Sequence, residues 1–246
     1  MKSFRQYLEE LYIQPNNRAK YGQIIFLVGG AASGKSTATK KFIETANYKI
    51  LNPDDVKELM VKAGQAGMPS YADIKDVDPN SPEGSQILHQ KMRDTRVSSK
   101  RARALISSKG RGQHLPNILF DRTFSFAGEF QKISQNLVSA GYDPNNIHVV
   151  FVFTELHISL ERNKARGRTL PDEVIVSTNR GAKERFSELF FGRAKGASAN
   201  GDYYIIINRG ERAIQVKEAG KRVDTASDIA KSVAELLGKR RGGTNQ

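Results

Sequence analysis

GGAASGKS, at residues 29–36, matches the pattern G-x-x-x-x-G-K-[ST] at every fixed position. The apolar run Gln23–Val28 precedes it, as expected of a strand buried on both faces, and a helical pattern from about Lys35 to Ala46 follows it. Small residues in such a loop allow successive backbone N–H groups to turn toward a phosphate, and the helix start adds a favourable dipole. The predicted nucleotide-phosphate site consists of Gly29, Gly30, Ala31, Ala32, Ser33, Gly34, Lys35, Ser36 and Thr37.

Two side chains of this loop carry chemistry. Lys35 supplies a positive charge to the β- and γ-phosphate oxygens, and the hydroxyl of Ser36 can bind Mg²⁺. The expected ligands are therefore ATP or GTP together with Mg²⁺. The loop by itself is compatible with a kinase, a GTPase, an ATPase or a motor, so the remaining motifs must decide between them.

Strands and helices alternate along the chain. Further strands are expected at 48–51, 117–120, 147–153 and 203–208, with helices over 85–108, 126–140, 155–166 and 172–190, a returning strand at 212–217 and a closing helix at 225–237. This alternation predicts an α/β fold, a P-loop NTPase-type three-layer sandwich with a mainly parallel sheet, a helical lid and a C-terminal hairpin plus helix.

We expect three parts along the chain. Residues 1–17 form an amphipathic helix or address segment, residues 18–238 form a single domain, and residues 239–246 form a basic tail. Within the domain, residues 64–84 are rich in Gly, Pro, Asp and Ser, which predicts a loop or mobile insertion.

The segment NPDDVK, at residues 52–57, follows the second expected strand. Groups at the carboxyl ends of parallel strands face the ligand crevice of such a sheet. Asp54 could therefore accept the proton of an attacking hydroxyl, and Lys57, one helical turn later, could hold a phosphate of the acceptor. The alternative is that Asp54 and Asp55 only complement the N-terminus of a helix that Asn52 caps.

The segment NILFDRT, at residues 117–123, is an apolar run that ends in an acid, as a Walker B strand does. Asp121 could orient water around Mg²⁺ or orient an arginine of the lid, so Ser36 and Asp121 are the predicted metal-site residues. Arg122 could reach the acceptor. The alternative for Asp121 is that it caps the next helix.

Three segments, in this order, resemble the kinase domain of phage polynucleotide kinases and the related zeta-toxin kinases. They are the loop at 29–37, NPDDVK at 52–57 and RNKARG at 162–167. The resemblance spans roughly residues 22–210 and implies an ATP-dependent kinase whose general base is Asp54. Lys57 stands where the polynucleotide kinases have an arginine, which keeps the charge and loses the bidentate fork.

The resemblance also assigns residues of the lid and the nucleotide site. Arg166 would bridge the transferring phosphoryl group, because a positioned guanidinium stabilises the charge on its equatorial oxygens. Arg162 would contact the nucleotide, and Arg209, in the segment YYIIINRG at 203–210, would flank its base. The zeta-type kinases carry an acid with a nearby arginine and threonine in a corresponding segment, which implies that Arg122 binds substrate.

The chain is strongly basic. Lys and Arg number 39 and Asp and Glu number 26, so the formal net charge is +13, and the stretch from Lys91 to Arg111 holds eight basic residues and one acid. This balance predicts a polyanionic partner and favours a nucleic-acid hydroxyl, either a 5′-OH end or a modified base, as the acceptor. Two alternatives are a nucleotide sugar or other small molecule, which the zeta-toxin resemblance implies, and a nucleic-acid-binding or virion-associated protein that keeps the fold as a scaffold.

Other protein classes are disfavoured. No apolar run approaches the roughly 18 residues that span a bilayer, so no membrane segment is expected. Without cysteine the chain cannot form disulfides, cysteine-ligated zinc sites or a thiol nucleophile. The start MKSFRQYLEELYI has no secretory pattern, which predicts a cytoplasmic protein. It also has a likeness to address peptides packaged in large phage heads, which would place a phage-encoded chain in the virion or the host cytoplasm. The oligomeric state stays open.

Overall fold

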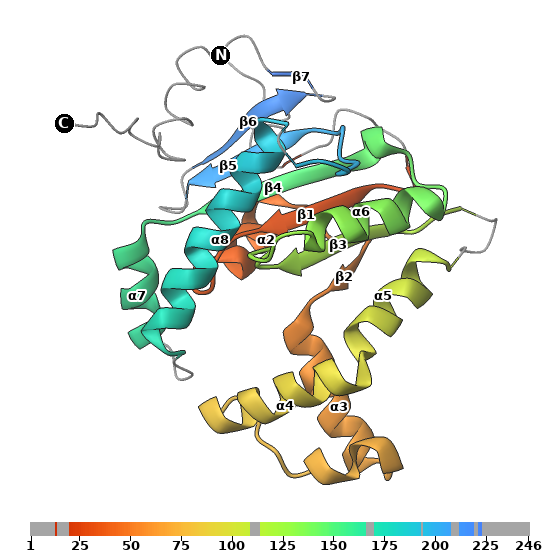
Figure 1. Ribbon diagram of the computed structural model, residues 1–246, viewed down its shortest axis with the longest axis vertical. Helices are drawn as coiled ribbons and strands as arrows, with labels where there is room; N and C mark the ends of the chain where they lie inside the picture. The colour runs from red at the N-terminus through yellow and green to blue at the C-terminus, as the bar shows by residue number, and fades with distance from the viewer. Residues whose placement is uncertain are drawn as a thin grey trace.

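The computed structural model describes residues 13, 20–108, 114–165, 170–192, 194–207, 212–218 and 221–222. Within them lies a seven-stranded sheet in the order β2-β3-β1-β4-β5-β6-β7 (Figure 1). The strands are β1 Ile24–Val28, β2 Tyr48–Leu51, β3 Asn117–Arg122, β4 Ile147–Phe153, β5 Tyr203–Ile207, β6 Arg212–Glu218 and β7 Lys221–Arg222. Strands β2, β3, β1, β4 and β5 are parallel, whereas β6 and β7 are antiparallel additions. The predicted mainly parallel sheet and its returning strand are confirmed.

Helices follow most of the strands. They are α2 Lys35–Phe42, α3 Pro53–Gln65, α4 Pro82–Thr95, α5 Val97–Ile106, α6 Glu129–Ser139, α7 Leu156–Lys164 and α8 Asp172–Phe190, with two short 3₁₀ helices, η1 Pro69–Ile74 and η2 Pro144–Asn146. Strand β1 lies in the middle of the parallel part, with β3 on one side and β4 on the other. The strand order therefore reverses at β1, and ligands of open α/β sheets bind at such a point.

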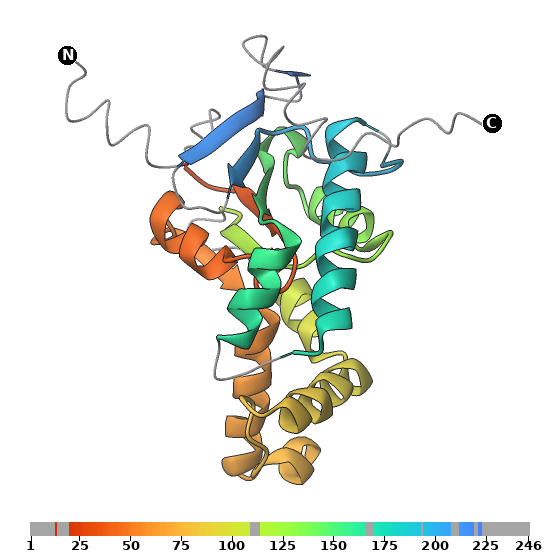
Figure 2. The ribbon, with the colours of Figure 1, turned by 90° about the vertical axis from the view of Figure 1, so that its left-hand side faces the viewer.

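Both faces of the sheet are covered, which gives the predicted three layers (Figure 2). Because side chains alternate along a strand, Ile24 and Phe26 of β1 pack toward α6 and α8, while Ile25 and Leu27 pack toward α2. On the first face the aromatic ring of Phe26 lies 4.3 Å from that of Phe130 of α6. All four β1 residues are almost completely buried, so the phosphate loop that follows them starts from a rigid base.

A helical lobe projects from the carboxyl edge of the sheet (Figure 1). Helices α3 and α4 and the 3₁₀ helix η1 share their own apolar cluster, formed by Val56, Met60, Val61, Ile74, Leu88 and Met92. The lobe joins the sheet directly, since α3 begins two residues after β2 ends. The first turn of α3 thus lies at the junction between the lobe and the sheet.

Two predictions for the lobe are wrong in part. The segment 64–84 is not a plain loop, because η1 packs on α3 where Gly64 leaves no room for a side chain against the backbone of Tyr71. The single helix expected over 85–108 is two helices, α4 and α5, which meet at Arg96. Arg96 has a φ of 53°, a left-handed conformation that ends one helix and starts a new direction.

Some predicted segments lie outside the described residues. They are the amphipathic helix or address segment at 1–17, apart from Ile13, the closing helix at 225–237 and the basic tail at 239–246. Ile13 is buried against the face that α2 covers, and its N–H donates to the carbonyl of Phe42. Of the helices that the structure describes, none combines the length and the apolar character needed to cross a membrane.

Candidate active site

The phosphate loop connects β1 to α2 in a backbone conformation that its small residues permit. Gly34 caps α2 with a φ of 87°, and Ala32 has a φ of 58°. A side chain at Gly29 would lie 2.7 Å from the hydroxyl of Ser33, so glycine is required there by close approach. The ammonium of Lys35 donates to the carbonyls of Gly29 at 2.9 Å and Gly30 at 3.0 Å. A positive charge held against the loop, beside the N-terminus of a helix, fits a nucleotide triphosphate.

Helix α8 supports this loop from the side. Thr178 accepts a hydrogen bond from the N–H of Ala31 at 3.1 Å, and the amide of Asn179 donates to the carbonyl of the same residue at 3.0 Å. Directly after β4, the hydroxyl of Thr154 donates to the carbonyl of Ser33 at 2.7 Å. These three side chains fix the backbone whose N–H groups would meet the phosphates.

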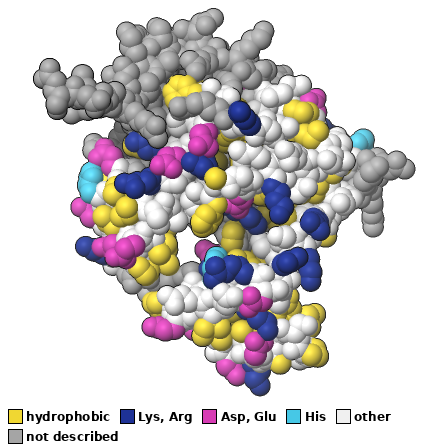
Figure 3. Space-filling model, in the orientation of Figure 1, with side chains coloured by type: hydrophobic (Ala, Val, Ile, Leu, Met, Phe, Trp, Pro, Cys, Tyr) yellow, Lys and Arg dark blue, Asp and Glu magenta, His cyan; other side chains and the backbone are white. Residues whose placement is uncertain are grey.

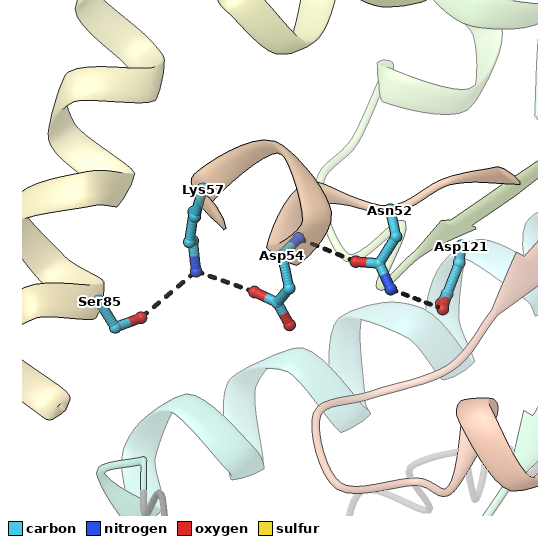
Figure 4. A network of polar contacts seen from close by, with 5 residues as sticks. All are labelled: Asn52, Asp54, Lys57, Ser85 and Asp121. Carbon is cyan, nitrogen blue, oxygen red and sulfur yellow. Dashed lines mark hydrogen bonds and ion pairs between the residues drawn. The ribbon is translucent and has the colours of Figure 1, made fainter. Parts of the chain in front are cut away.

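The acceptor side of the site begins at Asn52, between β2 and α3. Its side-chain oxygen accepts from the N–H of Asp54 at 2.9 Å, which confirms the predicted N-cap. Its amide nitrogen donates to Asp121 at 3.2 Å (Figure 4). One asparagine therefore joins the end of β3 to the first turn of α3 and orients the two acids that the sequence indicated.

Lys57 lies beside Asp54 and is mostly buried. Its ammonium is 3.0 Å from a carboxylate oxygen of Asp54 and 3.3 Å from the hydroxyl of Ser85 on α4 (Figure 4). The side chain of Lys57 is 8% exposed and that of Asp54 is 61% exposed, so the lysine holds a carboxylate that remains open to solvent. In this structure Lys57 positions Asp54, and its predicted contact with an acceptor phosphate stays a prediction.

The end of β3 carries the acid expected near the metal. Burial raises the pKa of Asp121, and the positive charge of Lys35 opposes this rise, whereas Asp54 and Asp55 reinforce it. The phosphate loop, α3 and β3 thus bring their charges close to one another. Ser36, exposed in the first turn of α2, and Asp121 provide the oxygen atoms that suit Mg²⁺.

Arg122 follows Asp121 and connects three elements. Its guanidinium forms an ion pair with Glu129 of α6 at 2.8 Å and donates to the hydroxyl of Ser98 of α5 at 2.7 Å. Its Nε is buried without a hydrogen-bond partner among the described residues. The arginine fastens α5 to the sheet here, and its predicted contact with the acceptor stays a prediction.

The lid is tied at its base by an asparagine. The amide of Asn163, which is buried, donates to the carbonyl of Leu170 at 2.7 Å, and its oxygen accepts from the N–H of Leu170 at 3.0 Å. Arg162 lies in the last turn of α7. Arg166 and Arg209 lie outside the described residues, so their predicted roles are not tested.

Several supporting residues were not predicted. Asn163 lies within RNKARG, yet the motif gave no sign that its amide would bond the backbone of Leu170. The other supporting residues are separated from their partners by many positions, so no local pattern could have indicated them; they are Ser85, Ser98, Glu129, Thr154, Thr178 and Asn179.

Solved structures with a similar fold were found. A chain of the AvrRxo1-ORF1:AvrRxo1-ORF2 complex with sulphate ions has a TM-score of 0.62 and 16% identity, covering 89% of this chain and 65% of that chain. A chain of the AvrRxo1-ORF1:-ORF2 complex with ATP has a TM-score of 0.56 and 18% identity, covering 90% of this chain and 66% of that chain. A chain from the PezAT toxin–antitoxin system of Streptococcus pneumoniae has a TM-score of 0.48 and 14% identity, covering 89% of this chain and 87% of that chain. This chain thus spans about 65% of the AvrRxo1 chain.

A search of the curated proteins finds no match. Superpositions at such low identity show the fold, and the family comes from the sequence. The family model of the zeta toxin matches residues 9–211, which is most of the chain and includes the phosphate loop, Asp54, Asp121 and the lid. The predicted resemblance to the zeta-toxin family is confirmed: the chain belongs to the zeta toxin family.

Proposed function

We propose that the protein transfers the γ-phosphate of ATP to a hydroxyl group of an acceptor bound between the phosphate loop and the lobe. The observation that carries this proposal is the line of contacts from Asp121 through Asn52 to Asp54 (Figure 4). It puts a solvent-open carboxylate at the edge of the sheet where Lys35 lies. A base beside a phosphate loop suits transfer to a hydroxyl better than it suits a purely mechanical nucleotide switch.

Each residue has a distinct role in this reaction. Asp54 accepts the proton of the attacking hydroxyl, and Lys57 keeps the carboxylate oriented through their 3.0 Å ion pair. Lys35 neutralises charge on the phosphoryl oxygens, and Arg166 of the lid adds to this. Ser36 and Asp121 would hold Mg²⁺, which supplies further neutralisation of the phosphates when bound. ATP is favoured over GTP because the AvrRxo1 complex was solved with ATP.

Membership of the zeta toxin family favours a small acceptor of the nucleotide-sugar class. The arrangement of charge is consistent with it. Both cations expected at the acceptor, Lys57 and Arg122, are already paired with acids, so the site offers few free charges to a polyanion. A nucleic-acid hydroxyl is the second candidate, and the net charge of +13 supports it.

The test is transfer of labelled γ-phosphate from ATP to a panel of nucleotide sugars, 5′-OH DNA and RNA oligonucleotides, and DNA containing hydroxymethyluracil. We expect label on a nucleotide sugar, and we expect Lys35→Ala and Asp54→Ala to abolish it. Asp55→Ala is the matched control, because Asp55 is also an exposed acid in the first turn of α3, whereas the ion pair of Lys57 is with Asp54.

The outcomes separate the parts of the proposal. Label on an oligonucleotide would replace the first acceptor class with the second. Near-normal transfer by Asp54→Ala, or an equal loss in Asp55→Ala, would remove Asp54 as the base. Label on no member of the panel, with folded protein and bound ATP, would count against phosphotransfer to these acceptors.

A further inference from the structure

Helix α5 exposes a row of cations. Arg96, at its N-cap, and Lys100 and Arg103, within it, are four and three positions apart and so lie along one side of the helix. All three side chains are exposed, and none forms an ion pair with another described residue. In Figure 3, Lys and Arg side chains gather on the part of the surface where Figure 1 draws α5.

This row differs from two other cations of the lobe. Lys91 is paired with Asp73 at 2.8 Å, and Lys57 is paired with Asp54. In α5, by contrast, like charges follow one another at helical spacing, and the first turn contains no acid to complement the helix N-terminus. The helix therefore carries an uncompensated positive charge that an external anion would stabilise.

A cavity of about 430 Å³ lies beside this row, between α5 and the edge strand β2. Its lining contains two cations and neither an acid nor an aromatic ring; the residues are Lys49, Ile50, Arg101, Ala104, Leu105 and Ser108. The Nη1 atom of Arg101 is buried and has no hydrogen-bond partner among the described residues. The charged side chains of Arg101 and Lys49 both line the cavity, and together they would attract an anionic oxygen there.

We propose that α5 and this cavity bind the phosphate backbone of a nucleic-acid strand. Arg101 and Lys49 hold one phosphate at the cavity, and the exposed row contacts the phosphates next to it. From Arg96 to Arg103 the helix rises about 10 Å, so the three exposed cations can reach neighbouring phosphates of one strand. The cavity lacks a ring on which a base could stack, so the binding reads the backbone and not the sequence.

An anionic membrane is a poorer fit for the same charges. A helix that binds a lipid surface inserts an exposed apolar face beside its cations. The large apolar side chains of α5, among them Leu105 and Ile106, instead pack on the core beneath the sheet. This inference does not rest on the proposed function, because binding to the backbone requires neither ATP nor Asp54.

The first experiment measures fluorescence anisotropy of a labelled single-stranded DNA oligonucleotide over a series of salt concentrations, without nucleotide. A triple variant removes the row, and a second triple variant removes three exposed lysines elsewhere with the same change in net charge. The two variants are Arg96→Gln/Lys100→Gln/Arg103→Gln and Lys40→Gln/Lys62→Gln/Lys75→Gln.

We expect the α5 variant to lose at least about tenfold in affinity near 0.1 M salt. Its slope of log affinity against log salt should fall by about 2, since each single-strand phosphate contact contributes about 0.7. The control triple variant should change little. Equal losses of affinity in both variants would mean that only the net charge matters, which would contradict a specific role of α5. Unchanged binding by the α5 variant would overturn the proposal. Stronger binding to phosphatidylserine vesicles than to DNA through the same residues would also overturn it.

Arg101→Leu distinguishes a role of Arg101 in DNA binding at the cavity from a role in the stability of the fold. If Arg101 serves only the structure, its loss lowers the melting temperature and leaves the affinity for DNA unchanged, which would contradict its role in binding. If Arg101 holds a phosphate at the cavity, the variant binds DNA more weakly, whatever its melting temperature. In either case transfer to the small-molecule panel reports on the proposed function independently.

Discussion

Replacing Gly30 by alanine tests whether α8 holds the phosphate loop in its working position. Gly30 lies where the loop passes the side chain of Asn179. That amide is fixed by hydrogen bonds to the carbonyls of Ala31 at 3.0 Å and Ile175 at 2.8 Å, so it cannot rotate away freely. A methyl group at Gly30 therefore has to displace either the amide or the loop.

The size of the displacement follows from the structure. A Cβ atom at Gly30 would lie 2.5 Å from Nδ2 of Asn179, whereas non-bonded atoms settle at about 3.5 Å, so the two groups must separate by about 1 Å. A misplacement of about 1 Å at a catalytic group can reduce the rate about a hundredfold. We expect Gly30→Ala to lose roughly that factor in transfer and to bind ATP more weakly, while stability falls by about 1–3 kcal/mol.

The assay is γ-phosphate transfer, with calorimetric titration of ATP and urea denaturation on the same preparations. Gly30→Ala/Asn179→Ala is the matched variant, because it removes the amide that the methyl group would meet. It should regain part of the lost activity, although Asn179→Ala by itself loses the contact with Ala31. Activity of Gly30→Ala within about threefold of the wild type would refute this reasoning. So would a double variant whose fold loss of activity equals the product of the fold losses of the two single variants.

Three further changes have definite expectations. Asn163→Ala removes both hydrogen bonds to Leu170, so urea denaturation should show a loss of about 2 kcal/mol and the KM for ATP should rise. Lys57→Met replaces a buried cation by an apolar chain of similar length; it should keep its melting temperature while transfer falls about ten- to a hundredfold, because Asp54 is no longer held. Burial lowers the pKa of His148 below its ordinary value of 6.5, so the unfolded chain binds the proton more readily. The contribution of the neutral His148 to the free energy of unfolding should therefore be fully present above pH 6.5 and should fall as the pH drops below it. When denaturation is compared at pH 7 and pH 5, this loss of stability should be smaller in His148→Gln.

The parts of the fold that sequence could predict are those with a local cause. Continuous apolar runs indicated β1 and β4 because strands of a parallel sheet are buried on both faces. Asn52-Pro53 indicated the start of α3, since asparagine caps and proline suits the first turn. The break between α4 and α5 was missed because Arg96 adopts a left-handed conformation that its residue type does not announce. Non-glycine residues rarely do so, and packing of the lobe decides it.

The site was predictable in its charged residues and not in their partners. Lys35, Asp54 and Asp121 follow from the order of strands and loops, since the carboxyl ends of parallel strands meet at one edge. The partners of Lys57 and Arg122 depend on where α4, α5 and α6 pack, and no spacing in the sequence encodes that. Both cations were therefore expected to face an acceptor, whereas the structure places them against Asp54 and Glu129.

Helix α8 connects the parts of the site that must work together. The hydrogen bonds between Asn163 and Leu170 join the last turn of α7 to the chain directly before α8 begins. Further along, Asn179 holds the phosphate loop, and Gly181 allows the loop after β3 to approach so closely that a side chain there would lie 2.6 Å from the carbonyl of Ser125. Because a helix moves as a rigid body, a shift of α8 would displace the lid, the phosphate loop and the end of β3 at the same time. If the protein transfers phosphate as proposed, we therefore expect substitutions on this helix to change the rate of transfer even where the residues touch no ligand.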